Sequence, residues 1–312
     1  MTSVARRLNR VVTLSDVRRP TPRNPELSDV LAGRQLTVAY QPIVARRHAD
    51  GHERWCVDGV EALLRAHTPA GAVLRPDRLL PAIEKAGLLK PLFMFVFAES
   101  LNMWRTLRDQ GQSLSLSVNV HAQVLQDDDL PRMICTLLEL AGLPPERFTL
   151  ELTESNPIVD MPRAARNLWR LRRSRVRIAL DDFGSGFSTQ TRLDCLETDE
   201  IKIDKALVTG IEHMDEQRRI VEHVVELAHV RGMAVCAEGV ETQAALDVLG
   251  GLGVDRAQGF LIGRPQFEAA LPELLRQWGR GRDVDATGEH PQLLLPGFQP
   301  EACAGCGRSP CQ

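Results

Sequence analysis

The sequence predicts a (β/α)8, TIM-like barrel, an α/β fold in which strands and helices alternate. Short apolar segments alternate with longer amphipathic ones from Leu36 to about Trp278, and eight of the short segments are strand-like. The chain has 312 residues, which is enough for one large barrel. An open doubly wound sheet is the alternative fold, but no GxGxxG turn follows the first strand-like segment.

The predicted strands are short runs rich in apolar and β-branched residues. They cover residues 36–44, 57–65, 113–120, 147–155, 177–182, 199–204, 233–239 and 256–263. Helical spacing of apolar residues predicts the intervening helices at 91–110, 123–141, 160–174, 215–231 and 241–249. Pro162 near the start of one helix and Gly232 just after the end of another are typical boundary residues.

Residues outside the alternating region lack helix or strand periodicity. We predict a basic N-terminal arm at 1–33, the barrel domain at 34–279 and a flexible tail at 280–312. The tail contains Cys303, Cys306 and Cys311, and only the distant His290 could complete a zinc site. We therefore expect these cysteines to be free thiols.

Composition excludes several function classes. The net charge of -3 gives no general attraction to nucleic acid polymers or to an anionic membrane. No apolar stretch is long enough to span a bilayer, and no secretory core follows Arg6 and Arg7. The 7 cysteines are odd in number and scattered, which is typical of reduced thiols. These features predict a cytoplasmic protein.

The segment RIALDDFGSGF, at 177–187, places two adjacent carboxylates at the end of an apolar run. Neighbouring residues of a strand point to opposite faces, so Asp181 and Asp182 can share a site only if the strand stops and the backbone turns. Gly184 and Gly186 permit such a turn. The pair predicts either a divalent-cation site or, about equally, a turn in which an aspartate caps a helix.

Strand alternation brings one polar group from each of several strands to the same region of the barrel. The inward residues are Glu61, Asn119, Glu151, Asp181, Lys202, Glu238 and Gln258, and Gln41 shares a face with Ala39. Buried carboxylates are costly unless a cation neutralises them. Lys202 and Arg65 are too few to pair with all of these carboxylates, so ion pairs alone do not explain the set.

This set of side chains is rich in oxygen and contains neither histidine nor thiolate. Mg²⁺ and Mn²⁺ prefer such ligands, and five carboxylates suit two cations about 3.5–4 Å apart that activate water on a phosphoester. Lys202 could hold that water or neutralise phosphate charge. Arg65 could grip a phosphate or be a surface residue beyond the strand end. The residues thus predict metal-dependent phosphoester hydrolysis or a related metal-assisted reaction.

The motifs then show a specific resemblance. EALLR from Glu61, SVNV from Ser117, ELTES from Glu151, DDFGSGFS from Asp181, KID from Lys202, AEGVET from Ala237 and QGF from Gln258 stand in order. Together they resemble the EAL domain of cyclic di-GMP phosphodiesterases over residues 33–278. The resemblance implies hydrolysis of cyclic di-GMP to linear pGpG, a barrel whose first strand is antiparallel, a requirement for Mg²⁺ or Mn²⁺ with two ions per site, and a homodimer.

The resemblance also implies roles for single residues, which we carry over only where the motif matches. Ligands of the first cation would be Glu61, Asn119, Glu151 and Asp181, while Asp182 and Glu238 would serve the second. Lys202 would hold the catalytic water, and Glu238 would act as ligand or as base. Substrate would contact Gln41, Leu64, Arg65, Asn119, Asp182 and Gln258. Glu154 would anchor the DDFGSGFS loop and couple it to the dimer, and Glu241 would lie near the active site.

The main departure from the family pattern follows the DDFGSGF segment. Gln190 and Arg192 replace apolar or aromatic residues in the region of the family's dimer contact, so the dimer geometry is not predicted. A second hypothesis is a non-catalytic EAL module that binds cyclic di-GMP or a protein. It is disfavoured because such modules usually lose a metal ligand, and here every ligand position is kept.

Overall fold

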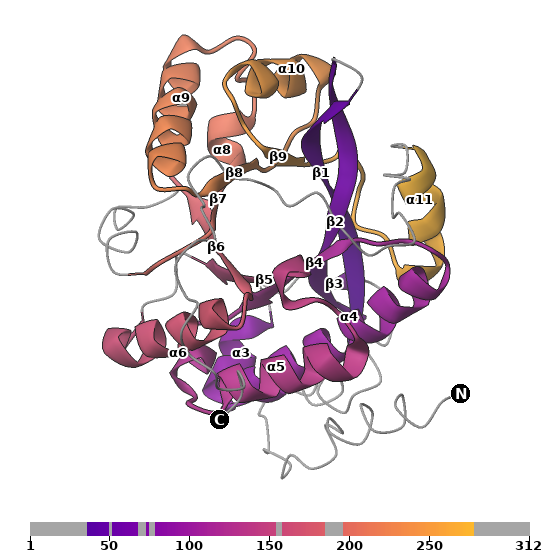
Figure 1. The fold of residues 1–312 in the computed structure, drawn as a ribbon, viewed down its shortest axis with the longest axis vertical. Helices are drawn as coiled ribbons and strands as arrows, with labels where there is room; N and C mark the ends of the chain where they lie inside the picture. Colours follow the sequence, from indigo (N-terminus) through magenta and orange to yellow (C-terminus); the bar gives the residue numbers. More distant parts are fainter. Residues whose placement is uncertain are drawn as a thin grey trace, which may run out of the picture.

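A single closed sheet forms the centre of the molecule (Figure 1). The computed structural model describes residues 36–49, 52–67, 73–74, 79–153, 158–184 and 196–277. The strand order is β1-β9-β8-β7-β6-β5-β4-β2-β3, and β1 also pairs with β2. That pairing closes eight strands into a barrel, which confirms the predicted fold class, while the two-residue β3 only extends the edge of β2.

The strands lie close to their predicted positions. Their bounds are β1 Leu36–Ala49, β2 His52–His67, β3 Val73–Leu74, β4 Ser115–Val120, β5 Phe148–Thr153, β6 Arg177–Phe183, β7 Glu200–Ile203, β8 Ala234–Ala237 and β9 Arg256–Gln258. The prediction that the last strand reaches residue 263 is wrong. β9 ends at Gln258 because the chain turns there, and the Gln258 carbonyl instead accepts a hydrogen bond from the Val240 N–H at 3.0 Å.

The first strand runs against its two neighbours. β1 pairs antiparallel with β2 and with β9, whereas the other pairings around the closed barrel are parallel. This direction agrees with the resemblance. It also places the two long strands β1 and β2 in one hairpin, whose register shifts between Ile43 and Val44. His48 and His52 belong to the strands at the turn of this hairpin.

Helices cover the outside of the barrel (Figure 1). They are α3 Leu80–Lys85, α4 Leu89–Asp109, α5 Leu130–Ala141, α6 Met161–Arg173, α8 Lys205–Val208, α9 Asp215–Val230, α10 Gln243–Gly251 and α11 Leu271–Gln277, with 3-10 turns at Val124–Gln126, Pro145–Arg147 and Glu268–Ala270. The short helices α3, α8 and α11 were not predicted, because periodicity is weak over so few residues.

Capping side chains explain where two of the helices begin. The Asp160 carboxylate accepts a hydrogen bond from the Arg163 N–H, and the Thr242 hydroxyl accepts one from the Ala245 N–H, each at 3.0 Å. Gly142 ends α5 with φ of 71°, a left-handed conformation that glycine adopts at little cost.

The predicted helix at 123–141 is not continuous. A 3-10 turn at Val124–Gln126 is separated from α5, which starts at Leu130. Between them the Asp127 carboxylate accepts a hydrogen bond from the Asp129 N–H at 2.9 Å. Such a local bond competes with the helical one, and Pro131 is tolerated only in the first turn of the new helix.

The strand faces agree with the predicted alternation. On β4, Leu116 and Val118 are fully buried and belong to the core between sheet and helices, while Ser117 and Asn119 point the other way, into the barrel. Two-residue periodicity therefore separates the outer apolar layer from the inner polar one.

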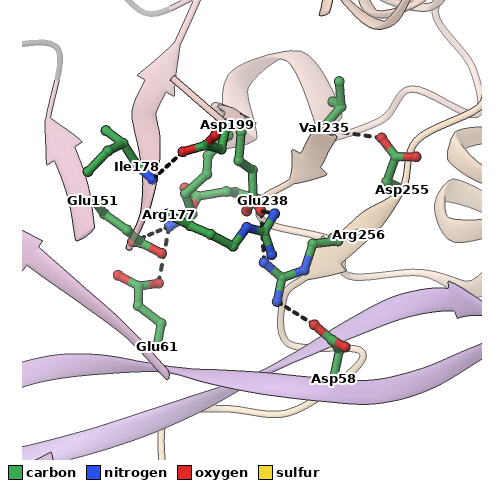
Figure 2. A network of polar contacts seen from close by, with 12 residues as sticks. Asp58, Glu61, Glu151, Arg177, Ile178, Asp199, Val235, Glu238, Asp255 and Arg256 are labelled. Atoms are coloured by element: carbon green, nitrogen blue, oxygen red, sulfur yellow. Dashed lines mark hydrogen bonds and ion pairs between the residues drawn. The ribbon is translucent and has the colours of Figure 1, made fainter. Parts of the chain in front are cut away.

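A layer of buried charge fills the N-terminal end of the barrel. The Arg256 guanidinium donates to Asp58 at 2.7 Å and to Glu200 at 2.8 Å, and Figure 2 shows it reaching toward Asp58 on β2. Arg177 adds a second bond to Glu200 at 3.1 Å, and Arg47 a second to Asp58 at 2.7 Å. These pairs tie strands β1, β2, β6, β7 and β9 together beneath the catalytic end.

Candidate active site

Four carboxylates surround one lysine, three of them on strands β2, β5 and β6 and the fourth directly after β8. The Lys202 ammonium lies 2.6 Å from Glu238, 2.8 Å from Glu151, 3.3 Å from Asp181 and 3.4 Å from Glu61. Lys202 and Glu151 are completely buried. Figure 2 shows the side chains of Glu61 and Glu151 facing one another inside the barrel. The structure thus brings together the predicted polar residues at the C-terminal ends of the strands, where barrel enzymes bind their substrates.

Negative charge exceeds positive charge in this cluster. Burial disfavours the charged form of Lys202, yet the surrounding carboxylates raise its pKa well above the ordinary value. Burial also raises the pKa of Glu238 to about 8 and, with the neighbouring Asp181 charge, raises that of Asp182 to about 6. The pKa of Glu151 is raised well above its ordinary value for the same main reason. One ammonium therefore does not neutralise the set, as the sequence predicted.

Two amide side chains bond Glu61 directly, and a third, Gln41, positions one of them. Asn119 Nδ2 donates to Glu61 Oε1 at 2.6 Å, and Gln258 Nε2 donates to Glu61 Oε2 at 2.7 Å. Gln258 Nε2 also lies 3.1 Å from Gln41 Oε1, and Gln41 Nε2 donates to the Gly263 carbonyl at 3.0 Å. Although burial opposes ionisation, Lys202 and these donors lower the pKa of Glu61, which keeps it an anion.

The paired aspartates reach one site by a different route from the predicted one. The strand does not stop at Asp181, because β6 continues to Phe183. Instead its register with β7 shifts between Leu180 and Phe183, and Asp182 adopts a left-handed φ of 59°. This bulge lets neighbouring carboxylates face the same side. Oxygens of Asp181, Asp182 and Glu238 lie within 4.8 Å of one another.

The donor set fits a divalent cation. Among the described residues, Glu151 Oε1, Asp181 Oδ1 and Gln258 Oε1 are buried oxygens without a hydrogen-bond partner. Asp181 Oδ1 has only its ionic contact with Lys202. Buried carboxylate oxygens are normally satisfied, so these atoms are ready to bind a hard cation.

The other predicted site residues do not all converge. The Leu64 side chain points outward into the apolar core, and Arg65 donates from Nη1 to the Leu64 carbonyl at 2.8 Å. Glu241 is exposed in the loop that follows β8. Glu154, Gln190 and Arg192 lie outside the described residues, as do the basic arm, Cys303, Cys306 and Cys311.

The layer of buried charge at the N-terminal end of the barrel was not predicted from the sequence. The sequence placed Arg256 on the same face as Gln258 but gave it no partner. Strand alternation was a usable signal, because Glu200 precedes Lys202 by two residues, and Arg256 precedes Gln258 by two. On β7 and on β9, the residue two positions before the active-site residue therefore points to the same face and belongs to the charge layer.

Comparison with known families gives a clear match. The EAL domain model matches residues 24–265. The chain belongs to the EAL domain family. The matched region contains Lys202 and all four carboxylates that surround it.

Several named proteins are similar to this EAL domain. The bifunctional diguanylate cyclase/cyclic di-GMP phosphodiesterase MucR of Pseudomonas aeruginosa is 33% identical over 241 residues, which cover 77% of this chain and 34% of MucR. The cyclic di-GMP phosphodiesterase RocR of the same organism is 34% identical over 247 residues, which cover 78% of this chain and 62% of RocR. An uncharacterized signaling protein of Caulobacter vibrioides is 36% identical over 264 residues, covering 84% of this chain and 31% of that protein. The chain thus spans about a third of several of its relatives.

Solved structures share the fold. A structure of the PaMucR phosphodiesterase in complex with c-di-GMP has a TM-score of 0.69 and 33% identity, covering 79% of this chain and 98% of that one. The EAL enzyme Bd1971, with cAMP and cyclic di-GMP bound, has a TM-score of 0.72 and 26% identity, covering 80% and 66% of the two chains. Within the described residues, no helix of the EAL domain has the length and apolar character needed to cross a membrane.

Proposed function

We propose that this EAL domain hydrolyses cyclic di-GMP to linear pGpG with the help of two divalent cations, Mg²⁺ or Mn²⁺. The observation that carries the proposal is the complete cluster of Glu61, Glu151, Asp181 and Glu238 around Lys202. Relatives named as cyclic di-GMP phosphodiesterases support the choice of substrate.

The residues divide into two groups of cation ligands. Glu61, Asn119, Glu151 and Asp181 would hold the first cation, and Asp182 and Glu238 would complete the second position. When bound, such a pair lowers the pKa of water and stabilises the leaving oxygen of a phosphoester. The unpartnered oxygens of Glu151 and Asp181 support this assignment.

Lys202 and Glu238 would handle the attacking water. The Lys202 ammonium lies between the carboxylates, where it can donate a hydrogen bond to that water and hold it in place. Glu238 is 2.6 Å from Lys202, so it lies where it could accept a proton from water held by the lysine.

Substrate contacts are assigned to the mouth of the barrel. Arg65 would bind phosphate, and Gln41 and Gln258 would contact the dinucleotide. Leu64 is left out of this assignment, because its side chain packs into the apolar core. The hydrogen bond from Gln258 to Glu61 would link substrate position to cation position. We further propose that the protein is cytoplasmic and forms a homodimer. Sedimentation velocity of the full chain tests whether it is a dimer.

Turnover tests the central proposal. Cyclic di-GMP is incubated with the full chain and Mg²⁺ or Mn²⁺, and pGpG is measured by chromatography. The Glu61→Ala variant should lose activity by orders of magnitude while keeping its circular dichroism spectrum, because it removes a cation ligand rather than core volume. Glu222→Ala, which removes an exposed carboxylate on α9, is the matched control and should retain full activity.

The same experiment addresses the non-catalytic alternative. If the wild-type chain binds cyclic di-GMP in calorimetry but forms no pGpG with either cation, the domain is a binding module and the phosphodiesterase proposal is wrong.

A further inference from the structure

Helix α6 presents arginines and a tryptophan on one exposed face. Arg166, Trp169, Arg170 and Arg173 follow the spacing i, i+3, i+4 and i+7, which places them on one side of a helix. All four are exposed. The opposite side is buried against the barrel through Ala164, Asn167, Leu168 and Leu171. Figure 1 shows α6 on the periphery of the molecule, away from the barrel mouth.

The positive charge of this face is only partly offset by the protein, because Asp128 lies within Coulombic range of Arg166 and Arg170. Among the described residues, Arg166, Arg170 and Arg173 form no ion pair, and neither does Arg175, which is exposed directly after the helix. The face therefore concentrates positive charge on a molecule whose net charge is -3.

Nearby acidic side chains are already paired with other cations. Asp128 binds Arg163 at 2.7 Å, and Asp129 binds Arg132 at 3.1 Å. Arg172, on the side of α6, is likewise engaged with Asp199 at 2.8 Å and with Glu197 at 2.6 Å. Each of these acids thus has an ion-pair partner other than Arg166, Arg170 or Arg173.

Apolar side chains accompany the arginines. Trp169 is 50% exposed, and the guanidinium carbon of Arg173 lies 4.8 Å from the centre of its ring. Val159, which immediately precedes the capping residue of α6, is 84% exposed. Exposed apolar surface is thus present in the middle of α6 at Trp169 and just before its start at Val159.

We propose that the exposed face of α6 binds the surface of a membrane that contains anionic phospholipids. Arginines beside the surface attract lipid phosphates, while a tryptophan and an aliphatic side chain enter the headgroup region. A nucleic acid backbone would satisfy the arginines but would give Val159 no apolar surroundings. The proposal concerns a surface separate from the barrel mouth and does not depend on the proposed hydrolysis.

Vesicle co-sedimentation tests this inference with the full chain. The vesicles are phosphatidylcholine alone, or phosphatidylcholine with phosphatidylglycerol at three parts to one. We expect binding only to the anionic vesicles, and loss of binding as NaCl rises. Each arginine contributes about fivefold to the partition coefficient, so Arg166→Gln/Arg170→Gln/Arg173→Gln should reduce it about a hundredfold.

A matched control carries the same change in net charge. Arg54→Gln/Arg105→Gln/Arg219→Gln alters three arginines on β2, α4 and α9 and should bind vesicles like the wild type. Brominated lipids should quench Trp169, and Trp169→Phe should reduce that quenching although three other tryptophans remain. Circular dichroism confirms that each variant is folded.

Three results would overturn the inference. In the first, the wild type binds neutral and anionic vesicles equally. In the second, the two triple variants bind anionic vesicles equally. In the third, the wild type binds no vesicles but binds labelled duplex DNA tightly. The last result would assign the α6 face to nucleic acid instead.

Discussion

At the scale of single residues, Lys202 is the centre of the active site. It is the cation that the four surrounding carboxylates share, and it is completely buried. Removing one partner of a buried ionic cluster leaves uncompensated charge, which costs more than the loss of an exposed ion pair. Lys202 should therefore stabilise the cation-free domain, in addition to the proposed role of holding water.

Lys202→Met should destabilise the domain by about 3–5 kcal/mol when EDTA is present. Thermal unfolding measures the effect. Saturating Mg²⁺ should recover part of the loss, because divalent cations supply the missing positive charge. Lys205→Met, which removes an exposed lysine three residues away, is the control and should leave the unfolding temperature nearly unchanged. Equal unfolding temperatures for the two variants would contradict this role of Lys202.

Cation binding should itself stabilise the native domain. Adding Mn²⁺ is expected to raise the unfolding temperature of the wild type, since the folded state binds the ion and the unfolded state does not. The stabilisation should grow with the logarithm of the Mn²⁺ concentration once this exceeds the dissociation constant. Asp181→Asn should abolish most of the shift. Asp247→Asn removes an exposed carboxylate on α10 and should keep it. A similar shift in both variants would place the ion elsewhere.

At the scale of elements, the bulge in β6 is what makes the site possible. The bulge carries Asp182 in a left-handed conformation, and Gly184 follows with φ of 98°. A Cβ at Gly184 would lie 2.6 Å from Leu207 Cδ1, so this position combines backbone strain with a close contact to α8. Both features hold the chain in the turn that brings Asp181 and Asp182 together.

Gly184→Ala should cost about 1–3 kcal/mol of folding free energy and lower cation affinity. Denaturant unfolding and a metal titration measure the two effects. Gly210→Ala is the comparison, because Gly210 also has a positive φ, of 77°, but open space around it. It should cost about 1–2 kcal/mol from strain alone and leave cation affinity intact. Loss of cation affinity in both variants would show that the close approach of Gly184 to Leu207 does not determine cation binding.

The charge layer at the base of the barrel makes stability depend on pH. Burial raises the pKa of Asp58 and Glu200, but Arg256, with Arg177 and other cations, outweighs burial and lowers both. An acid with a lowered folded pKa stabilises the protein above its unfolded pKa. That stability is lost as pH falls through the folded pKa, below about pH 4.

Arg256→Gln should therefore destabilise the domain by about 3–5 kcal/mol at neutral pH. The difference in unfolding free energy between this variant and the wild type should narrow at low pH, as Asp58 and Glu200 become protonated. Urea unfolding over a series of pH values checks this. Arg276→Gln, which breaks an exposed pair with Glu273, should have little effect at any pH. A difference that stays constant with pH would contradict the assignment.

At the scale of the whole molecule, alternation was the most informative feature of the sequence. It predicted the barrel and the inward face of Glu61, Glu151 and Lys202, because a strand offers only two faces and the helices require one to be apolar. It could not predict the bulge at Asp182, which depends on the register with β7. Nor could it identify the partners of Arg256, because pairs such as Arg256 and Asp58 are far apart in the chain.

The direction of β1 decides where neighbouring parts of the polypeptide meet the enzyme. Leu36 at the start of β1 pairs with Ala66, next to Arg65 at the catalytic end, whereas in an all-parallel barrel the first strand would start at the opposite end. Leu36, the first residue of β1, therefore lies beside the mouth of the barrel. In this architecture a partner that contacts the start of β1 would act next to the entrance, without a relay through the barrel wall.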